Sequence, residues 1–181
     1  MTTDPRPSID VLALALDQTA EVLSAIPAER LSDPTPCADW DVGRLVAHVV
    51  ADPGNFVMMA RGGQPDWSAE PPLPEDWTAE FRSSADALLT MWREAGDSVT
   101  PQAVDWQTAE FAVHTWDLVR ATAQSIELDP EVAQRGLDFM SGALTQDNRG
   151  EAFAPAVEVP EDAPVYDRLV AWAGRDPRLT T

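Results

Sequence analysis

PQAVDWQTAEFAVHTWDLVRATAQ, residues 101–124, has the pattern of one long helix. Pro101 stands at the first helical position, which tolerates proline because the backbone N–H there has no partner within the helix. On an α-helix, residues four apart lie one above the other, so Glu110 and His114 project from the same face. The stretch therefore predicts both a long structural element and a pair of side chains that can act on one ligand.

The segments on either side also have helical patterns. An apolar stripe runs through residues 8–26, and Asp41 is the expected N-cap of a second helix. Proline lacks a backbone donor and collides with the preceding turn, so Asp52-Pro53-Gly54 predicts a kink or a break in that second helix. The remaining predicted helices span residues 76–96, 130–146 and 165–175.

The intervening segments have the composition of loops, and no stretch shows a convincing strand alternation. Residues 27–40, 62–76 and 148–164 are irregular and rich in proline, glycine and polar residues. A chain of 181 residues is long enough to bury one core without disulfides. We therefore expect an all-α fold, an up-and-down four-helix bundle with a short extra C-terminal helix, forming one domain over residues 1–181.

The charge composition excludes several classes of function. All twelve basic residues are arginines, and the 31 acidic residues give a formal net charge of -19. Such a charge repels phosphate backbones and anionic membrane surfaces, so we expect neither a nucleic-acid nor a membrane partner. Because the chain has no lysine, it cannot form a Schiff base, a P-loop lysine contact or a Ser-Lys dyad.

Cysteine usage and hydropathy indicate the cell compartment. Cys37 is the single cysteine, so it cannot form an internal disulfide, which fits a reducing compartment. The sequence has neither a recognisable export signal nor an apolar run of about 18 residues. We expect a cytoplasmic protein, and the sequence leaves both a monomer and a homodimer open.

The second of the two histidines completes a candidate metal site. His48 lies mid-way along another predicted long helix. If the two helices face each other, His48, Glu110 and His114 form a two-histidine, one-carboxylate site with at least one open position. That arrangement is typical of a catalytic metal, whereas structural zinc is usually closed by four ligands. On spacing alone, a hydrogen-bonded core histidine with a surface glutamate is an equal alternative.

Aromatic side chains are candidates for the wall of a pocket beside this site. Trp106 lies on the same predicted helix face as the Glu–His pair, one turn earlier. Asn55, Phe56 and Met59 are expected opposite it, on the second helix. The proline-rich segment 62–76 could act as a lid over the pocket or serve only as a connection.

Four polar side chains could support the site. Arg44 shares a face with His48 and could bind an anionic group, although a simple salt bridge is the plainer interpretation. Asp52 and Asp117 could each accept the second ring N–H of a ligating histidine, or lie in solvent. Cys37 is a weak candidate for a nucleophile because no further histidine is free to activate it.

Three segments resemble a known family. Residues 35–50, TPCADWDVGRLVAHVV, and residues 110–124, EFAVHTWDLVRATAQ, resemble two signatures of the DinB-like helical-bundle proteins. The resemblance is to the branch that includes the N-terminal domain of mycothiol-dependent maleylpyruvate isomerase. The ending, residues 153–177, is similar to the ending of the small single-domain members of that branch.

The resemblance implies a divalent metal held by His48, Glu110 and His114, usually zinc; such ligands also suit nickel, iron, manganese and cobalt. It also implies an enzyme that activates a low-molecular-weight thiol, mycothiol in this branch. A free thiol has a pKa of about 8.5, and coordination to a cation deprotonates it to a nucleophilic thiolate. The thiolate would be transferred to a small electrophilic substrate or would catalyse its isomerisation. We expect Arg44, Asn55 and Trp106 to contact the bound thiol.

The sequence departs from the family pattern in two respects. It has no room for the C-terminal domain of the isomerase, so maleylpyruvate is not the expected substrate. The Asp52-Pro53-Gly54 segment directly after the histidine turn is also unusual and could reshape the pocket. Two alternatives stay open, a thiol-independent metal-assisted hydrolase, lyase or cyclase and a non-catalytic metal-binding protein.

Overall fold

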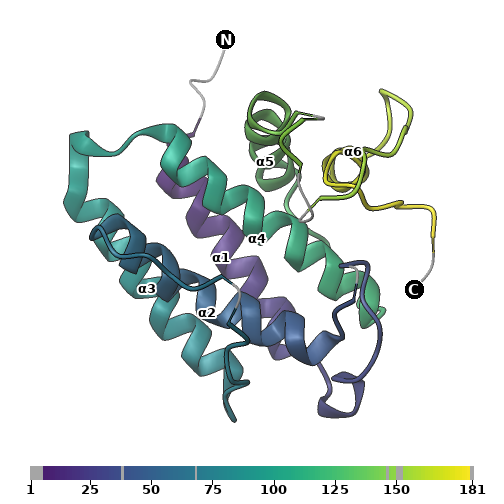
Figure 1. Cartoon of the computed structure of the whole chain (residues 1–181), viewed down its shortest axis with the longest axis horizontal. Helices are drawn as coiled ribbons and strands as arrows, with labels where there is room; N and C mark the ends of the chain where they lie inside the picture. Colours follow the sequence, from purple (N-terminus) through teal and green to yellow (C-terminus); the bar gives the residue numbers. More distant parts are fainter. Residues whose placement is uncertain (1–5, 38, 68, 146, 150–152, 180–181) are drawn as a thin grey trace.

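The computed structural model describes residues 6–179 except 38, 68, 146 and 150–152, and the described residues form helices and loops (Figure 1). Its α-helices are α1 Ser8–Ser24, α2 Val42–Ala60, α3 Trp77–Ala95, α4 Pro101–Ala121, α5 Pro130–Ala143 and α6 Val165–Trp172. Short 3-10 helices, η1 Ala28–Arg30 and η2 Gly96–Ser98, lie in the connections. The all-α prediction is confirmed. Within the described residues, none of the helices has both the length and the apolar composition needed to cross a bilayer.

Side-chain caps explain where three of these helices begin. The Asp41 carboxylate accepts the backbone N–H of Arg44 at 2.8 Å, and Asp76 caps α3 in the same way. Asp129 does so for α5, which begins at a proline as α4 does. Each cap satisfies a backbone donor that has no partner inside the helix. The cap predicted at the start of α2 is therefore confirmed.

Helix α2 continues through Pro53 without interruption. Of the two predicted alternatives, the break at this proline is therefore wrong, and the kink stays a prediction. Pro53 is buried, as are Val50 and Phe56 on either side of it, and α2 packs against both α3 and α4. Burial of these apolar side chains offsets the hydrogen bond that the proline cannot make.

The first four helices form a bundle, and α5 and α6 cover one side of it. α1 packs on α3 and α4, and α2 packs on the same two helices, so α1 and α2 lie diagonally opposite each other. α5 packs on α4, and α6 packs mainly on α5 (Figure 1). The layer made by α5 and α6 therefore covers α4, the helix that carries the Glu–His pair.

Hydrogen bonds show that α1 and α4 run in the same direction. Thr19 in the second half of α1 bonds to Thr115 in the second half of α4, with 2.7 Å between the hydroxyl oxygens. At the other end, Arg135 donates to both Ser8 and Asp105, near the starts of α1 and α4.

The other two helices run against this pair. Trp77 at the start of α3 donates to the carbonyl of Leu23 at the end of α1, so α3 is antiparallel to α1. His48 of α2 faces Glu110, and further along α2 Phe56 contacts Trp106, which precedes Glu110 in α4. α2 is therefore antiparallel to α4.

The two consecutive helices α2 and α3 therefore run in the same direction. The predicted up-and-down order, in which each helix runs against the one before it, is wrong for this pair. The connection, residues 61–76, returns the chain along the bundle between them. A segment of this length can extend about 50 Å, whereas a 19-residue helix is about 28 Å long. Helical periodicity gives the length of each helix but not its direction, so the sequence pattern could not distinguish the two orders.

An aromatic cluster lies in the centre of the bundle. Phe111 of α4 is fully buried, and its ring centroid lies 5.8 Å from that of Phe56 and 5.9 Å from that of Phe81. Both pairs have an edge-to-face geometry, which adds to the stabilisation from burial. The three rings connect α2, α3 and α4.

Removing the central ring tests this account of the core. Phe111→Ala should lower the free energy of unfolding by about 3–5 kcal/mol, because it deletes a buried ring and leaves a cavity. Leu179→Ala, at a residue that is 68% exposed, is the matched control and should change little. Urea unfolding followed by circular dichroism measures both, and equal losses in the two variants would contradict this packing.

Candidate metal centre

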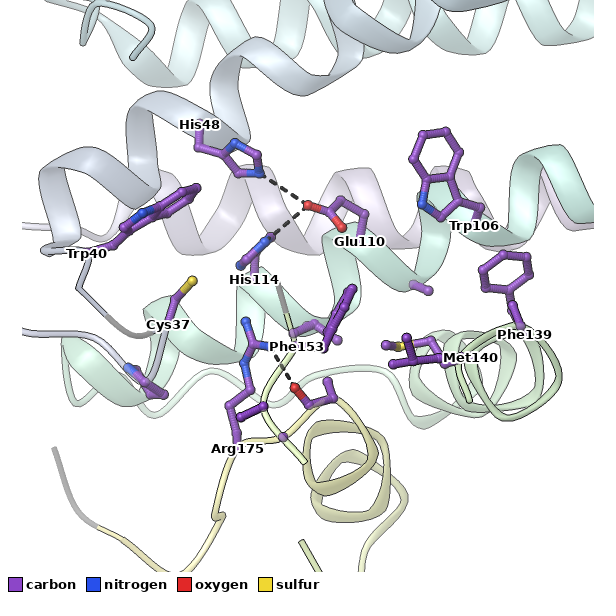
Figure 2. Close-up of a pocket in the computed structure, with 18 of the residues that line it drawn as sticks. Cys37, Trp40, His48, Trp106, Glu110, His114, Phe139, Met140, Phe153 and Arg175 are labelled. Atoms are coloured by element: carbon purple, nitrogen blue, oxygen red, sulfur yellow. Dashed lines mark hydrogen bonds and ion pairs between the residues drawn. The ribbon is translucent and has the colours of Figure 1, made fainter. Parts of the chain in front are cut away.

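Three side chains from two helices converge on one point. His48 comes from α2, and Glu110 and His114 come from successive turns of α4 (Figure 2). The Oε1 atom of Glu110 lies 3.1 Å from the Nε2 atom of each histidine. One potential ligand atom from each residue lies within 4.8 Å of the others. The structure thus brings together the three residues that the sequence predicted as ligands.

The spacing of these atoms fits a divalent cation. Ligand atoms held about 2.1 Å from one tetrahedral zinc ion lie roughly 3.4 Å apart, close to the distances between Glu110 and the two rings. Two imidazoles and a carboxylate also suit other divalent transition metals. The three side chains border a cavity, so the protein leaves room for a further ligand. The triad, meaning His48, Glu110 and His114, is therefore a candidate open metal site.

The triad is also an acid–base cluster. Burial by itself would raise the pKa of Glu110, but the charge on His114 and hydrogen bonds from both rings hold that pKa well below its usual range. Burial would likewise lower the pKa of His114, yet Glu110 and Asp117 raise it well above its usual value. Without a cation, Glu110 is thus ionised and His114 is protonated at neutral pH. Since a metal needs neutral imidazole, metal binding at His114 must release a proton.

The second ring nitrogen of His114, Nδ1, is held by a hydrogen bond to a buried carboxylate. Its Nδ1 lies 3.1 Å from Oδ2 of Asp117, a fully buried carboxylate. Arg175 donates to the same carboxylate, from Nη2 at 2.9 Å and from Nε at 3.3 Å. Burial would raise the pKa of Asp117, but the Arg175 charge and the His114 hydrogen bond lower it. Asp117 therefore occupies the position predicted for it, and it fixes the orientation of a ligating ring.

Arg175 was not found by the sequence reasoning. It lies 58 residues after Asp117, in the segment that follows α6, and its side chain is only 8% exposed. Helical spacing relates residues within one helix, so it carries no information about this pair. The resemblance of the chain ending to family members was the one signal that this segment belongs near the site.

Asp52 lies in a different place from the one predicted. Its Oδ2 is 3.3 Å from Nε2 of His48, the same nitrogen that faces Glu110. The expectation that Asp52 accepts the second ring N–H is therefore wrong. One helical turn beyond His48, the carboxylate reaches the tip of the ring instead of its other side. Burial raises the pKa of Asp52 to about 7; the charge of His48 opposes this increase, and the charge of Glu110 adds to it.

Trp40 is a second residue that the sequence reasoning left without a role. Its ring centroid lies 4.9 Å from that of His48 and 6.3 Å from that of His114. The Thr35 hydroxyl lies 2.9 Å from the carbonyl of Trp40, which fixes the short loop before α2. Cys37 in the same loop lines the cavity, and burial raises the pKa of its thiol. A thiol with a raised pKa is a poor nucleophile at neutral pH.

A cavity of about 950 Å³ lies beside the triad (Figure 2). Trp106, the predicted wall residue, lines it, and so does Phe56. Apolar side chains from α5 and the following segment form the opposite wall: Phe139, Met140, Leu144 and Phe153. The cavity is thus shared between the bundle and the layer that covers it.

The other predicted contact residues lie apart from this cavity. Asn55 lines a smaller cavity of about 250 Å³, which His48 also borders. The Arg44 guanidinium lies 4.9 Å above the Trp40 ring and 3.1 Å from Glu70, and it lines neither cavity. The salt-bridge interpretation of Arg44 therefore holds.

The segment after α2 approaches the cavity through one aromatic residue. Trp67 contacts Phe56 and Trp106, with ring centroids 6.1 and 6.5 Å apart, respectively. It lines both cavities, and half of its surface is exposed. The connection therefore covers part of the site, as the lid alternative requires.

Comparison with known proteins identifies relatives of this chain. A family profile described as the mycothiol maleylpyruvate isomerase N-terminal domain matches residues 12–119. Two uncharacterised proteins of Mycobacterium tuberculosis, Rv0738 of strain H37Rv and MT0763 of strain CDC 1551, are each 30% identical to the chain. Each alignment covers 91% of this chain and 95% of the relative. No solved structure matches.

The buried pair of Asp117 and Arg175 can be tested by its effect on stability. Arg175→Leu should lower the free energy of unfolding by roughly 3–5 kcal/mol, because it leaves a buried carboxylate without its partner. The stabilisation from Asp117 is present above its unfolded pKa of about 3.9 and is lost as the pH falls through its lower folded pKa. Acid unfolding of the variant should therefore begin at a higher pH. Arg178→Leu, at an exposed arginine, is the control and should leave both measurements unchanged.

The acid–base cluster predicts proton-coupled metal binding. Zinc binding near pH 7 should release about one proton from His114, so the affinity should fall roughly tenfold for each unit that the pH is lowered below the His114 pKa. Calorimetric titrations in buffers of different ionisation enthalpy measure the release. His114→Asn should abolish this proton release and weaken zinc binding by more than about 100-fold. Asp52→Asn should weaken zinc binding by roughly 10–100-fold. Glu80→Gln, at an exposed carboxylate, is the control. Zinc binding of unchanged affinity in His114→Asn would contradict the site.

Proposed function

Because the chain belongs to the mycothiol maleylpyruvate isomerase N-terminal domain family, we propose that it is a metal-dependent enzyme acting with a low-molecular-weight thiol. The thiol we propose is mycothiol, and the reaction is its transfer to a small electrophile or the isomerisation of one. The observation that carries the proposal is the triad, whose ligand atoms converge beside a large cavity.

The proposed metal is zinc, bound by Nε2 of His48, Nε2 of His114 and the carboxylate of Glu110. When bound, such a cation supplies a thiolate nucleophile at neutral pH by lowering the pKa of a coordinated thiol. Three protein ligands with an open position are the arrangement that this chemistry requires.

The neighbouring residues have separable tasks in this proposal. Asp117 and Arg175 fix the ring of His114 so that Nε2, not Nδ1, points to the centre of the triad. The Asp52 carboxylate lines neither cavity, so it acts through His48 by adding negative charge beside the ring nitrogen. That charge favours a bound cation, so Asp52 is a positioning residue.

The aromatic walls control the surroundings of the nucleophile. Trp40 covers both imidazole rings from one side, and Trp106 lines the cavity one helical turn from Glu110. These apolar faces lower the polarity of the region beside the triad. A thiolate in such surroundings is less solvated, and therefore more reactive, than one in water.

A thiol-dependent conjugation assay tests the proposal. Zinc-loaded protein should form a conjugate from mycothiol and monochlorobimane faster than the reagents do alone, followed by fluorescence. His48→Ala should lower kcat/KM by more than about 100-fold, since changes to the outer partners of a metal site alone cost roughly 10–100-fold. Glu80→Gln, at an exposed residue, should keep the full rate.

The other outcomes of this assay argue against the proposal. Turnover of a substrate without any added thiol would replace the proposal by a metal-assisted hydrolase, lyase or cyclase, in which a coordinated water is the nucleophile. Tight zinc binding with no acceleration for any electrophile would identify a non-catalytic metal-binding protein.

A further inference from the structure

The larger cavity extends beyond the triad into an apolar compartment. Figure 2 shows Trp106, Phe139 and Met140 beyond Glu110, on the side away from Cys37. Met140 is buried, and Phe139 is half-buried. We call the part of the cavity lined by Trp106, Phe139, Met140, Leu144 and Phe153 the apolar compartment.

The compartment depends on a close approach of α5 to α4. A Cβ atom on Gly136 would lie 3.2 Å from the Cα atom of Ala109, so the absence of a side chain lets the helices meet closely. Phe139 and Met140, one turn later on α5, line the cavity, as does Ala143 a further turn on. The compartment is therefore built into the packing of the covering layer on the bundle.

The cavity offers no free cation to an anionic substrate. The chain has no lysine, and Arg175 is the one arginine among the described residues that line the cavity. Each of the three guanidinium nitrogens of Arg175 already donates, Nε and Nη2 to Asp117 and Nη1 to the carbonyl of Ala173. Its charge is balanced by Asp117, so its remaining N–H groups offer no net positive charge to a carboxylate of the substrate.

The remaining charges around the cavity are unfavourable to an anion. Asp39 and Glu110 both line it, and the whole chain carries a net charge of -19. The two positive charges of a divalent cation would be balanced by Glu110 and by the thiolate that the proposed function requires. A carboxylate entering the apolar compartment would therefore lose its hydration without gaining a partner.

We infer that the apolar compartment binds an uncharged electrophile with an apolar body of aromatic size, and that it discriminates against electrophiles carrying a carboxylate. As a statement about the substrate, this rests on the proposed function. In a transfer reaction, the thiol sulfur forms a bond to the electrophilic carbon, and the leaving group, a halide for example, departs with the bonding electron pair. The thiol proton goes to solvent.

Binding of two unreactive probes tests the compartment independently of any thiol. The probes 2-naphthalenemethanol and 2-naphthoate share one ring system and differ in charge. Calorimetry on the full chain at pH 7.5 without added metal, so that no open metal position can bind the carboxylate, should show the alcohol binding at least tenfold more tightly than the carboxylate. Equal affinities, or tighter binding of 2-naphthoate, would overturn the inference.

A charge placed in the compartment should reverse this preference. Ala143→Arg adds a guanidinium at an exposed position of α5 that lines the cavity, and it should tighten 2-naphthoate binding by at least tenfold. Ser141→Arg adds the same charge to an exposed position of α5 that does not line the cavity, and it should leave both affinities unchanged. An identical response of the two variants would overturn the inference, and the wild-type comparison decides it if Ala143→Arg does not fold.

The reaction itself separates this inference from the proposed function. With mycothiol and zinc-loaded protein, benzyl chloride should give a kcat/KM at least tenfold above that of 4-(chloromethyl)benzoate. If neither halide reacts while 2-naphthalenemethanol still binds selectively, the thiol chemistry is wrong and the apolar compartment stands. If both halides react equally well, the thiol chemistry stands and the inferred selectivity is wrong.

Discussion

The carboxylate of Glu110 lies between two imidazole rings, and the rest of the site is arranged around this contact. It joins α2 to α4 at a point where His48 and His114 would otherwise face each other as two bases in partly buried surroundings. An ionised carboxylate there favours positive charge, either a proton on His114 or a bound cation. The same interaction therefore stabilises the protein without metal and prepares the site for metal.

Support for this contact extends outward through the structure. His114 is held by Asp117, and Asp117 is held by Arg175 from the segment after α6. A chain of charge-assisted hydrogen bonds thus connects the ligand to the end of the covering layer. On the other side, Asp52 contacts His48 and Trp40 covers both rings. The bundle supplies the ligands, and the α5–α6 layer supplies the fixed orientation and the apolar compartment.

The part of the site that lies on one helix was predictable from the sequence. Helical spacing places Glu110, His114 and Asp117 on successive turns of α4, and the structure shows them in contact as expected. His48, as the other of the two histidines, was predicted to be the third ligand on the condition that the two helices face each other, and the resemblance to the family implied the same residue. Asp52 shows the limit of spacing, because knowing its helix face did not reveal which nitrogen of the His48 ring it would approach.

The sequence by itself determined the helices, the Asp41 cap of α2 and the three residues of the triad, because periodicity, capping and ligand type are properties of short segments. Only the tertiary structure decided that α2 and α3 run in the same direction, that α2 continues through Pro53, and that Arg175 reaches Asp117. It also decided that α5 forms the apolar wall of the cavity. These features depend on how distant segments pack, where burial and ion pairing outweigh the local preferences that a sequence pattern records.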